Sequence, residues 1–200
     1  MTVRRSGGIG NVSRVLRSRK QAKDSYDKLS RFYDLFSSPF ERKYQDVALG
    51  MLGIKNGEKA LEIGFGTGYC LARIAESVGN TGKAYGIDIS PGMANETRLR
   101  LEREGLSSRV ELTNGDAIRL PYLNGQFDIV FMSFTLELFD TPKIPRVLSE
   151  ARRVLEKGGR IGVVSLSREG GVSMPIKIYE WFHAVMPDYV DCRPIFAENP

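Results

Sequence analysis

Apolar residues along this chain gather into short continuous runs, and between these runs they recur with helical spacing. A short apolar run is typical of a buried strand, and a spacing of three to four residues is typical of an amphipathic helix. We expect strands at 58–64, 83–89, 109–116, 127–134 and 160–166. We expect helices at 24–36, 40–52, 68–78, 91–104, 142–156 and 174–185. Because strands and helices alternate, the pattern predicts an α/β fold with a doubly wound, mainly parallel sheet.

Two of the predicted element boundaries carry local signals. Ser90 followed by Pro91 is typical of a helix start, because serine caps free backbone N–H groups and proline suits the first helical position. The pair Gly158-Gly159 is expected to end the helix at 142–156. We therefore expect the fifth strand to begin only after these glycines.

The positive charge of the chain is concentrated near its N-terminus. The net charge is +5, but residues 1–31 hold nine Lys and Arg against two Asp, so this segment carries +7 and the rest carries −2. We expect residues 1–22 to form a flexible basic arm. The alternatives are a patch for nucleic acid or an anionic membrane surface, and an Arg- and Ser-rich organelle import segment.

The remaining composition narrows the class of protein. The 200 residues suffice for one domain with a sizeable core, and no run of about 18 apolar residues predicts a membrane span. Cys70 and Cys192 have neither disulfide-framework nor zinc spacing, which fits a reducing, cytoplasmic compartment. A single histidine, His183, cannot build a metal site without carboxylates, so we expect no metal.

The stretch ALEIGFGTGYC places Gly64, Gly66 and Gly68 directly after the first predicted strand. Glycines at this density let the backbone approach a ligand closely. Tyr69 stands where the dinucleotide fingerprint has glycine or alanine, and the Gly-Lys-Ser/Thr of a P-loop is absent. The loop and the nearby carboxylate of Glu62 therefore suit S-adenosylmethionine, which is cationic and has no phosphate.

Two further carboxylates follow the second and third predicted strands. Asp88 ends the second strand, where it can accept hydrogen bonds from both hydroxyls of a ribose. Asp116, in Asn114-Gly115-Asp116-Ala117, is placed either to accept from the amine of an adenine or to cap a turn. Because ligands of such sheets bind beyond the carboxyl ends of the strands, these groups predict an adenosine site at that edge.

The chain resembles the class I S-adenosylmethionine-dependent methyltransferases in the stretches LEIGFGTG, YGIDISPGM, NGDAIRLPYLNGQFDIVFMSFTLELF and ARRVLEKGGR, over about residues 24–190. It is most similar to the ubiquinone/menaquinone C-methyltransferase-like branch. The stretch YDKLSRFYD resembles the N-terminal cofactor lid of that branch. The resemblance implies a Rossmann-like sheet with strand order 3-2-1-4-5. After the basic arm at 1–22, it implies a helical lid at 23–53 and a methyltransferase core at 54–200 that is truncated at its C-terminus.

The resemblance also implies a set of cofactor-binding residues. Glu62, the three glycines and Ser133 belong to the methionine end of the site and Asp88 to the ribose. Ile89, Met93, Asp116 and Ala117 belong to the adenine. The full set is Glu62, Gly64, Gly66, Gly68, Asp88, Ile89, Met93, Asp116, Ala117, Ser133 and, in the lid, Tyr33. Tyr33 is alternatively part of an ordinary helix core. The candidates for a catalytic base, in no order, are His183, Tyr33, Glu137 and Asp140.

The implied function is methyl transfer to a small molecule, such as a quinol-like or other aromatic or lipidic acceptor. Tyr69 and the lack of a Tyr-x3-Lys pair disfavour an NAD-dependent oxidoreductase. The chain reads Met132-Ser133-Phe134-Thr135 after the fourth strand, where base-amino methyltransferases have Asn/Asp-Pro-Pro-aromatic. An RNA methyltransferase that uses the basic arm and a non-catalytic S-adenosylmethionine-binding module stay open as alternatives.

The family's sheet has two further strands, which the C-terminal residues do not predict. Only PDYVDCRPIFAENP follows Met186, and its prolines argue against a strand pair. We therefore expect strands 6 and 7 to be missing, as in a fragment or a truncated relative, and the fifth strand to be a poorly covered edge. Such an edge predicts self-association, and the basic arm predicts peripheral contact with a membrane.

Overall fold

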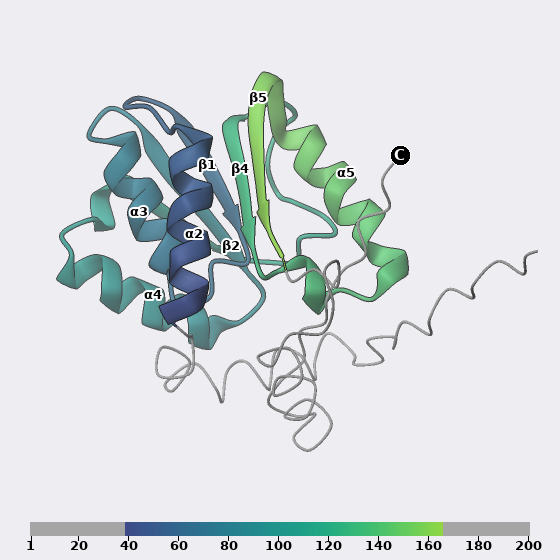
Figure 1. Ribbon diagram of the computed structural model, residues 1–200, viewed down its shortest axis with the longest axis horizontal. Coiled ribbons are helices and arrows are strands. Elements are labelled where there is room, and N and C mark those ends of the chain that lie inside the picture. The colour runs from purple at the N-terminus through teal and green to yellow at the C-terminus, as the bar shows by residue number, and fades with distance from the viewer. Residues whose placement is uncertain (1–38, 166–200) are drawn as a thin grey trace, which may run out of the picture.

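The computed structural model describes residues 39–165 as a five-stranded parallel sheet covered by helices on both faces (Figure 1). The strand order is β3-β2-β1-β4-β5, which confirms the predicted doubly wound topology. The arm at 1–22, the first part of the expected lid, the helix expected at 174–185 and any sixth or seventh strand lie outside the described residues. So do Tyr33, His183 and Cys192, and the proposed division into arm, lid and core stays a prediction.

Each predicted strand within this range is present. The strands are β1 (Lys59–Ile63), β2 (Lys83–Asp88), β3 (Val110–Asn114), β4 (Phe127–Ser133) and β5 (Leu155–Val164). The α-helices are α2 (Pro39–Leu52), α3 (Tyr69–Val78), α4 (Pro91–Arg103) and α5 (Ile144–Val154). Short 3-10 helices lie at Ser107–Arg109, Leu136–Leu138 and Thr141–Lys143. No helix within residues 39–165 is long and apolar enough to cross a membrane.

The alternation of side chains along the strands divides the core in two. Ala60 of β1 and Phe131 of β4 pack in one cluster with residues of α2, α3 and α4, whereas Leu61 and Val130 pack in the other with residues of α5. Figure 1 shows the corresponding arrangement, with α2, α3 and α4 on one side of the sheet and α5 on the other. Both faces of the sheet are therefore buried, as the apolar strands predicted.

The start of α4 confirms the local signal at Ser90 and Pro91. The Ser90 hydroxyl accepts a hydrogen bond from the Met93 backbone N–H at 3.1 Å, and Pro91 occupies the first turn. Gly105 follows the helix with a φ of 67°, a conformation that glycine adopts without strain.

The junction between α5 and β5 differs from the prediction. The helix ends at Val154 and the strand begins at Leu155, so Gly158 and Gly159 lie inside β5 rather than at a helix end. Leu155 is only 7% exposed and pairs with Phe127, and burial of its side chain favours extended backbone over another helical turn. The register of β4 and β5 then shifts between Phe127 and Ile129, as in a bulge.

Strand β5 is covered on one face by α2. A Cβ atom on Gly162 would lie 2.9 Å from the end of the Leu52 side chain of α2, so a larger residue here would have to displace Leu52. On the opposite face, Ile161 and Val163 are 45% and 43% exposed. Within residues 39–165, β4 is the one strand that pairs with β5. Self-association through this strand stays a prediction.

Candidate functional site

Three polar side chains converge at the carboxyl ends of the central strands. Glu62 of β1 pairs with Gly86 of β2 and with Phe131 of β4. Asp88 and Ser133 lie two residues beyond those partners, so all three polar residues share the face that α2, α3 and α4 cover. The sheet thus brings together three of the predicted site residues from separate strands.

The three glycines of the loop after β1 have different roles. Gly64, Gly66 and Gly68 have φ angles of 75°, 53° and 81°, a region that costs other residues about 1–2 kcal/mol. A Cβ on Gly64 would lie 2.5 Å from Thr135, and one on Gly68 would lie 2.6 Å from Thr97. A Cβ on Gly66 would have no atom of the described residues within 4 Å. Gly64 and Gly68 therefore permit close packing, and Gly66 leaves its side of the loop open for a ligand.

Hydrogen bonds from two neighbouring elements fix this loop. The Asp88 carboxylate accepts from the backbone N–H of Gly66 at 3.0 Å and from that of Ser90 at 2.9 Å. From α4, Thr97 donates to the Gly66 carbonyl at 2.8 Å, and Arg100 donates to the Thr67 carbonyl at 2.8 Å. Asp88 therefore joins the loop to the start of α4, and the open side of Gly66 is held in one position.

Glu62 is a buried carboxyl with an unsatisfied atom. The residue is 2% exposed, and no group in residues 39–165 forms a hydrogen bond with its Oε2 atom. Burial, and then the negative charge of Asp88, hold the pKa of Glu62 well above its usual range. A buried polar atom without a partner is costly in a folded protein. The site therefore fits a cationic ligand group such as the ammonium of S-adenosylmethionine.

The loop after β3 is tied to the same place. The Asn114 side chain and the Gly115 backbone N–H both donate to the Asp88 carbonyl, at 3.0 and 2.9 Å. Asp116 accepts from the Ile118 backbone N–H at 3.0 Å, so it caps a turn, which was one of its two predicted roles. Ala117 is 7% exposed and packs in the core. Contact of Asp116 and Ala117 with an adenine stays a prediction.

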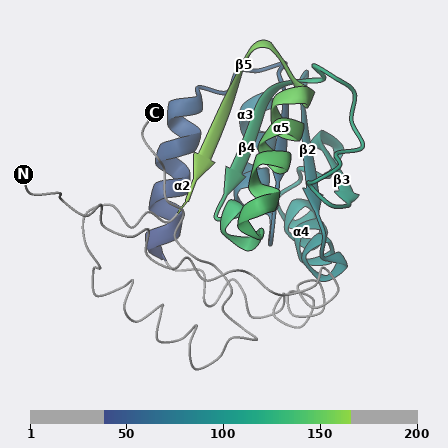
Figure 2. The same cartoon turned by 90° about the vertical axis from the view of Figure 1, so that its right-hand side faces the viewer.

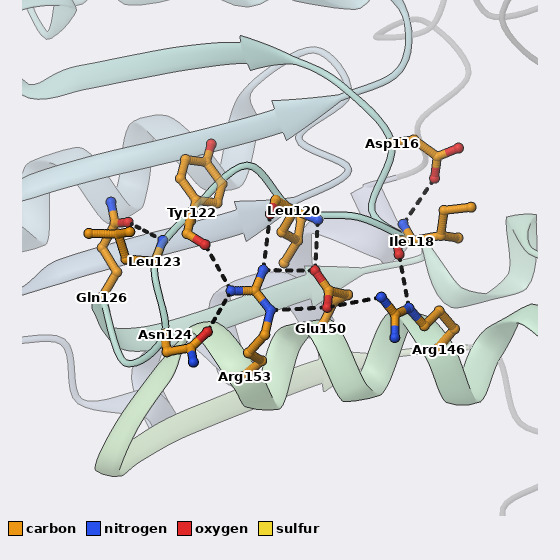
Figure 3. A network of polar contacts seen from close by, with 10 residues as sticks. All are labelled: Asp116, Ile118, Leu120, Tyr122, Leu123, Asn124, Gln126, Arg146, Glu150 and Arg153. Atoms are coloured by element: carbon orange, nitrogen blue, oxygen red, sulfur yellow. Dashed lines mark hydrogen bonds and ion pairs between the residues drawn. The ribbon is translucent and has the colours of Figure 1, made fainter.

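A polar network fastens the rest of that loop to α5, and Figure 3 shows its side chains pointing from the helix toward the loop. Glu150 accepts from the Leu120 backbone N–H at 2.9 Å. Arg153 donates to the carbonyls of Leu120 and Tyr122 at 3.0 and 2.8 Å and to the Asn124 side chain at 2.9 Å. The network therefore holds the loop that carries Asp116 in place.

The Arg153 guanidinium lies 2.8 Å from the Glu150 carboxylate. Hydrogen bonds from this guanidinium lower the pKa of Glu150 from 4.5 to about 2, against the opposing effect of burial, with help from the Leu120 N–H and the charge of Arg146. Glu150 is therefore ionised throughout the neutral range.

Two residues predicted to contact the adenine follow β2. Ile89 comes directly after Asp88 and is half-buried. Met93 is 2% exposed and packs in the core cluster with Phe65 and Leu71. The structure thus places Met93 under the site rather than at its surface, and the adenine contact of both residues stays a prediction.

The residues after β4 include two candidates for a base. Glu137 lies in the 3-10 helix Leu136–Leu138 and is 0% exposed. Asp140 precedes the next 3-10 helix and is half-buried. Phe134, directly after Ser133, has a φ of 50°, which is rare for a residue with a side chain and often marks a functional site. Among residues 39–165, no group of histidine, cysteine and carboxylate side chains could hold a metal ion.

Sequence reasoning missed the contribution of α2. Gln45 of this helix donates to the Ser133 hydroxyl at 3.0 Å. The Tyr69 hydroxyl, next to the last loop glycine, donates to the Asp46 carboxylate at 2.9 Å. Arg42 and Arg73 lie over the Tyr69 ring, 5.1 and 5.8 Å from its centroid. The helical pattern of 40–52 predicts the helix, but nothing in it indicates these long-range partners.

Comparison with known proteins gives this arrangement a family context. The family model described as "ubiE/COQ5 methyltransferase family" matches residues 11–196. The demethylmenaquinone methyltransferase of Bacillus velezensis is 29% identical over 166 residues, which cover 81% of this chain and 70% of the relative. The enzyme of the same name from Bacillus mycoides is 31% identical over 168 residues, which cover 82% of this chain and 70% of the relative.

Two solved structures illustrate the range of similar folds. The 4+2 cyclase SpnF is 29% identical with a TM-score of 0.58, and the match covers 64% of this chain and 47% of the cyclase. A SAM dependent methyltransferase from Aquifex aeolicus is 22% identical with a TM-score of 0.62, and the match covers 80% of this chain and 87% of that protein. The chain thus spans less than half of the cyclase, and the second similarity concerns the fold alone.

Proposed function

Because this chain belongs to the ubiE/COQ5 methyltransferase family, we propose that it methylates a small aromatic acceptor of the quinol type. Its cofactor is S-adenosylmethionine, as for methyltransferases of this class. The observation that carries the proposal is the pairing of an unsatisfied buried carboxyl, Glu62, with the open side of Gly66 at the same edge of the sheet. The Glu62 carboxyl suits a cation, and the open side of Gly66 lets a ligand lie close to the backbone.

Each part of the cofactor has residues that would hold it. The carboxyl of Glu62 would face the ammonium, and the open side of Gly66 would face the methionine chain. Asp88, already oriented by two backbone N–H groups, would accept from the ribose diol. Asp116 and Ala117 would lie at the adenine edge. Ser133 would close the methionine end.

When bound, S-adenosylmethionine supplies an electrophilic methyl group on a positively charged sulfur. The residues of this chain contribute by fixing geometry and by excluding water. Rigid placement of two reactants in line accounts for much of the rate of such a displacement. The bonds to the Gly66 N–H and carbonyl and to the Ser133 hydroxyl supply that rigidity here. A weakly solvating surface also favours a reaction in which positive charge is lost.

The acceptor class rests on the names of the relatives. The first similar proteins are named demethylmenaquinone methyltransferases, and the acceptor in that name is a quinone. For this chain we propose only the chemical class of the acceptor, which is a quinol. The cytoplasmic location and contact with a membrane through the basic arm stay predictions.

A second candidate function is binding of the cofactor without methyl transfer. It is favoured by the 29% identity to a protein named as a 4+2 cyclase. Turnover separates the two candidates, because both functions predict binding of the cofactor but only one predicts a methylated product.

The test uses the full chain, S-adenosylmethionine labelled in its methyl group and dithionite-reduced 2-geranyl-1,4-naphthoquinone. We expect the label to enter the organic phase with the quinol, and calorimetry to show binding of S-adenosylhomocysteine. Parallel reactions with transfer RNA test the RNA alternative. Binding without transfer to any acceptor would favour the second candidate, and transfer to RNA alone would refute the proposed acceptor.

A further inference from the structure

The inner face of α2 continues from the core into the space beyond the strand ends. Leu52 of this face packs on β5 at Gly162, and Gln45 reaches Ser133 at the end of β4. Figures 1 and 2 both show the first turn of α2 beyond the tips of β4 and β5. Residues four apart share one face of a helix. Glu41, four residues before Gln45, therefore lies on the same face, beyond Ser133.

The opposite face of α2 is the solvent-exposed one. Tyr44, Val47 and Met51 recur at helical spacing and are 46%, 55% and 84% exposed. Glu41 is half-buried in comparison. Burial raises the pKa of Glu41, and no charged or hydrogen-bonding neighbour among the described residues offsets this effect. A carboxylate with a raised pKa is a stronger base than an exposed one.

Three other carboxylates near the site are less available. Asp88 accepts from two backbone N–H groups, and Glu62 lies at the bottom of the site, 2% exposed, where it suits the cofactor. Glu137 is 0% exposed and cannot contact a substrate without rearrangement. Glu41 instead lies one helical turn before Gln45, which contacts Ser133, and it is half-buried rather than fully buried.

We propose that Glu41 is a catalytic residue that accepts the hydroxyl proton of the methyl acceptor. The inference rests on the proposed function, because it presumes an acceptor with an ionisable hydroxyl. It goes beyond that function by naming the group that activates the acceptor.

The proton transfer and the methyl transfer balance without another reactant. The acceptor O–H bond breaks and its proton passes to the Glu41 carboxylate, so that electron density moves into the ring. The ring carbon forms a bond to the methyl carbon while the methyl–sulfur bond breaks and its electron pair stays on sulfur. The ring C–H proton then leaves to water and the carboxyl of Glu41 returns its proton to the oxygen, which restores the aromatic quinol.

The experiment compares the full chain with Glu41→Gln, Glu41→Asp and the control Glu102→Gln, an exposed carboxylate on α4. The assay measures methyl transfer to reduced 2-geranyl-1,4-naphthoquinone and to a ring-fluorinated analogue with a more acidic hydroxyl. We expect Glu41→Gln to lose about 100-fold in kcat with the first acceptor and about 10-fold or less with the second. We expect Glu41→Asp to fall between Glu41→Gln and the unsubstituted chain, and Glu102→Gln to match that chain.

A binding measurement separates chemistry from folding. Glu41→Gln should bind S-adenosylhomocysteine within about twofold of the unsubstituted chain, since the proposed role does not involve the cofactor. Loss of that binding, an equal kcat loss with both acceptors, or a loss below about threefold would overturn the role of Glu41. If the unsubstituted chain methylates neither quinol, the acceptor class itself fails, and the role of Glu41 fails with it.

Discussion

Replacement of Glu150 by glutamine tests the ion pair of the network that fastens the loop after β3 to α5. Glutamine keeps the shape of the side chain and an oxygen that can accept from the Leu120 N–H. The change removes the negative charge that faces Arg153 at 2.8 Å. It also replaces one of the two oxygens that accept hydrogen bonds from Arg153 with an NH2 group. Its effect on the free energy of unfolding therefore measures the ion pair together with its hydrogen bonds.

The pKa of Glu150 sets an upper limit to this contribution. A fall from 4.5 to about 2 corresponds to about 3 kcal/mol, at about 1.4 kcal/mol for each tenfold change in an equilibrium constant. The Arg146 and Arg153 side chains are 61% and 31% exposed, and water screens their charges. We therefore expect Glu150→Gln to cost about 1–2 kcal/mol at pH 7.

The pH dependence follows from the direction of the shift. Because the folded state lowers the pKa of Glu150, its stabilisation is fully present above about pH 4.5 and is lost as the pH falls toward about 2. The difference between the unsubstituted chain and Glu150→Gln should therefore shrink by more than half between pH 7 and pH 3.

Urea denaturation at both pH values measures this difference, and S-adenosylhomocysteine binding reports on the loop. A matched control is Glu76→Gln, since Glu76 pairs with Arg73 at 3.3 Å with both side chains 51% exposed. We expect the control to change stability by about 0.5 kcal/mol or less. An equal loss for Glu150→Gln at pH 7 and pH 3, or a loss no larger than that of the control, would refute the electrostatic explanation.

Three further predictions concern the cofactor site. Gly64→Ala should cost about 2–4 kcal/mol of unfolding free energy because its Cβ would meet Thr135. Gly66→Ala should cost only about 1 kcal/mol of unfolding free energy but weaken S-adenosylhomocysteine binding about tenfold or more. Urea denaturation and calorimetry test the pair, and a larger loss of stability for Gly66→Ala than for Gly64→Ala would contradict the prediction. Asp88→Ala should lose about 1.5–3 kcal/mol of binding by calorimetry, and a loss of a few tenths would remove it from the site. Binding at pH 7 should release up to about one proton from Glu62, because a cation lowers the pKa that burial raised. Calorimetry in buffers of different ionisation enthalpy measures this release, and persistence of the release in Glu62→Gln would contradict the assignment.

The sequence pattern predicted the described part of the fold well because both faces of the sheet are buried. Apolar runs such as FDIVFMSF leave little choice but a central strand. The pattern failed at the start of β5, where the helical spacing of 142–156 continues past the true helix end at Val154. There the burial of Leu155 against β4 decides the backbone conformation, and local spacing carries no information about such a tertiary contact.

The candidate site was predictable where it depends on local motifs. The glycine loop and Asp88 follow from a short loop after one strand and an acid at the end of the next. The hydrogen bond of Gln45 to Ser133 joins residues 88 positions apart, and the strained Phe134 is an ordinary residue type. Neither feature has a signature in the sequence, because each arises only when separate elements pack together.

The contact of Tyr69 with Asp46 has a thermodynamic consequence for a reaction with two substrates. Tyr69 follows the glycine loop and donates to Asp46 of α2. Gln45 of the same helix donates to Ser133. The free energy of ordering the loop is therefore linked to the free energy that holds α2 in position. Such linkage is reciprocal. If binding of one ligand changes the affinity for the second by some factor, binding of the second changes the affinity for the first by the same factor. Any coupling that this contact carries between the two binding events is therefore equal in both directions.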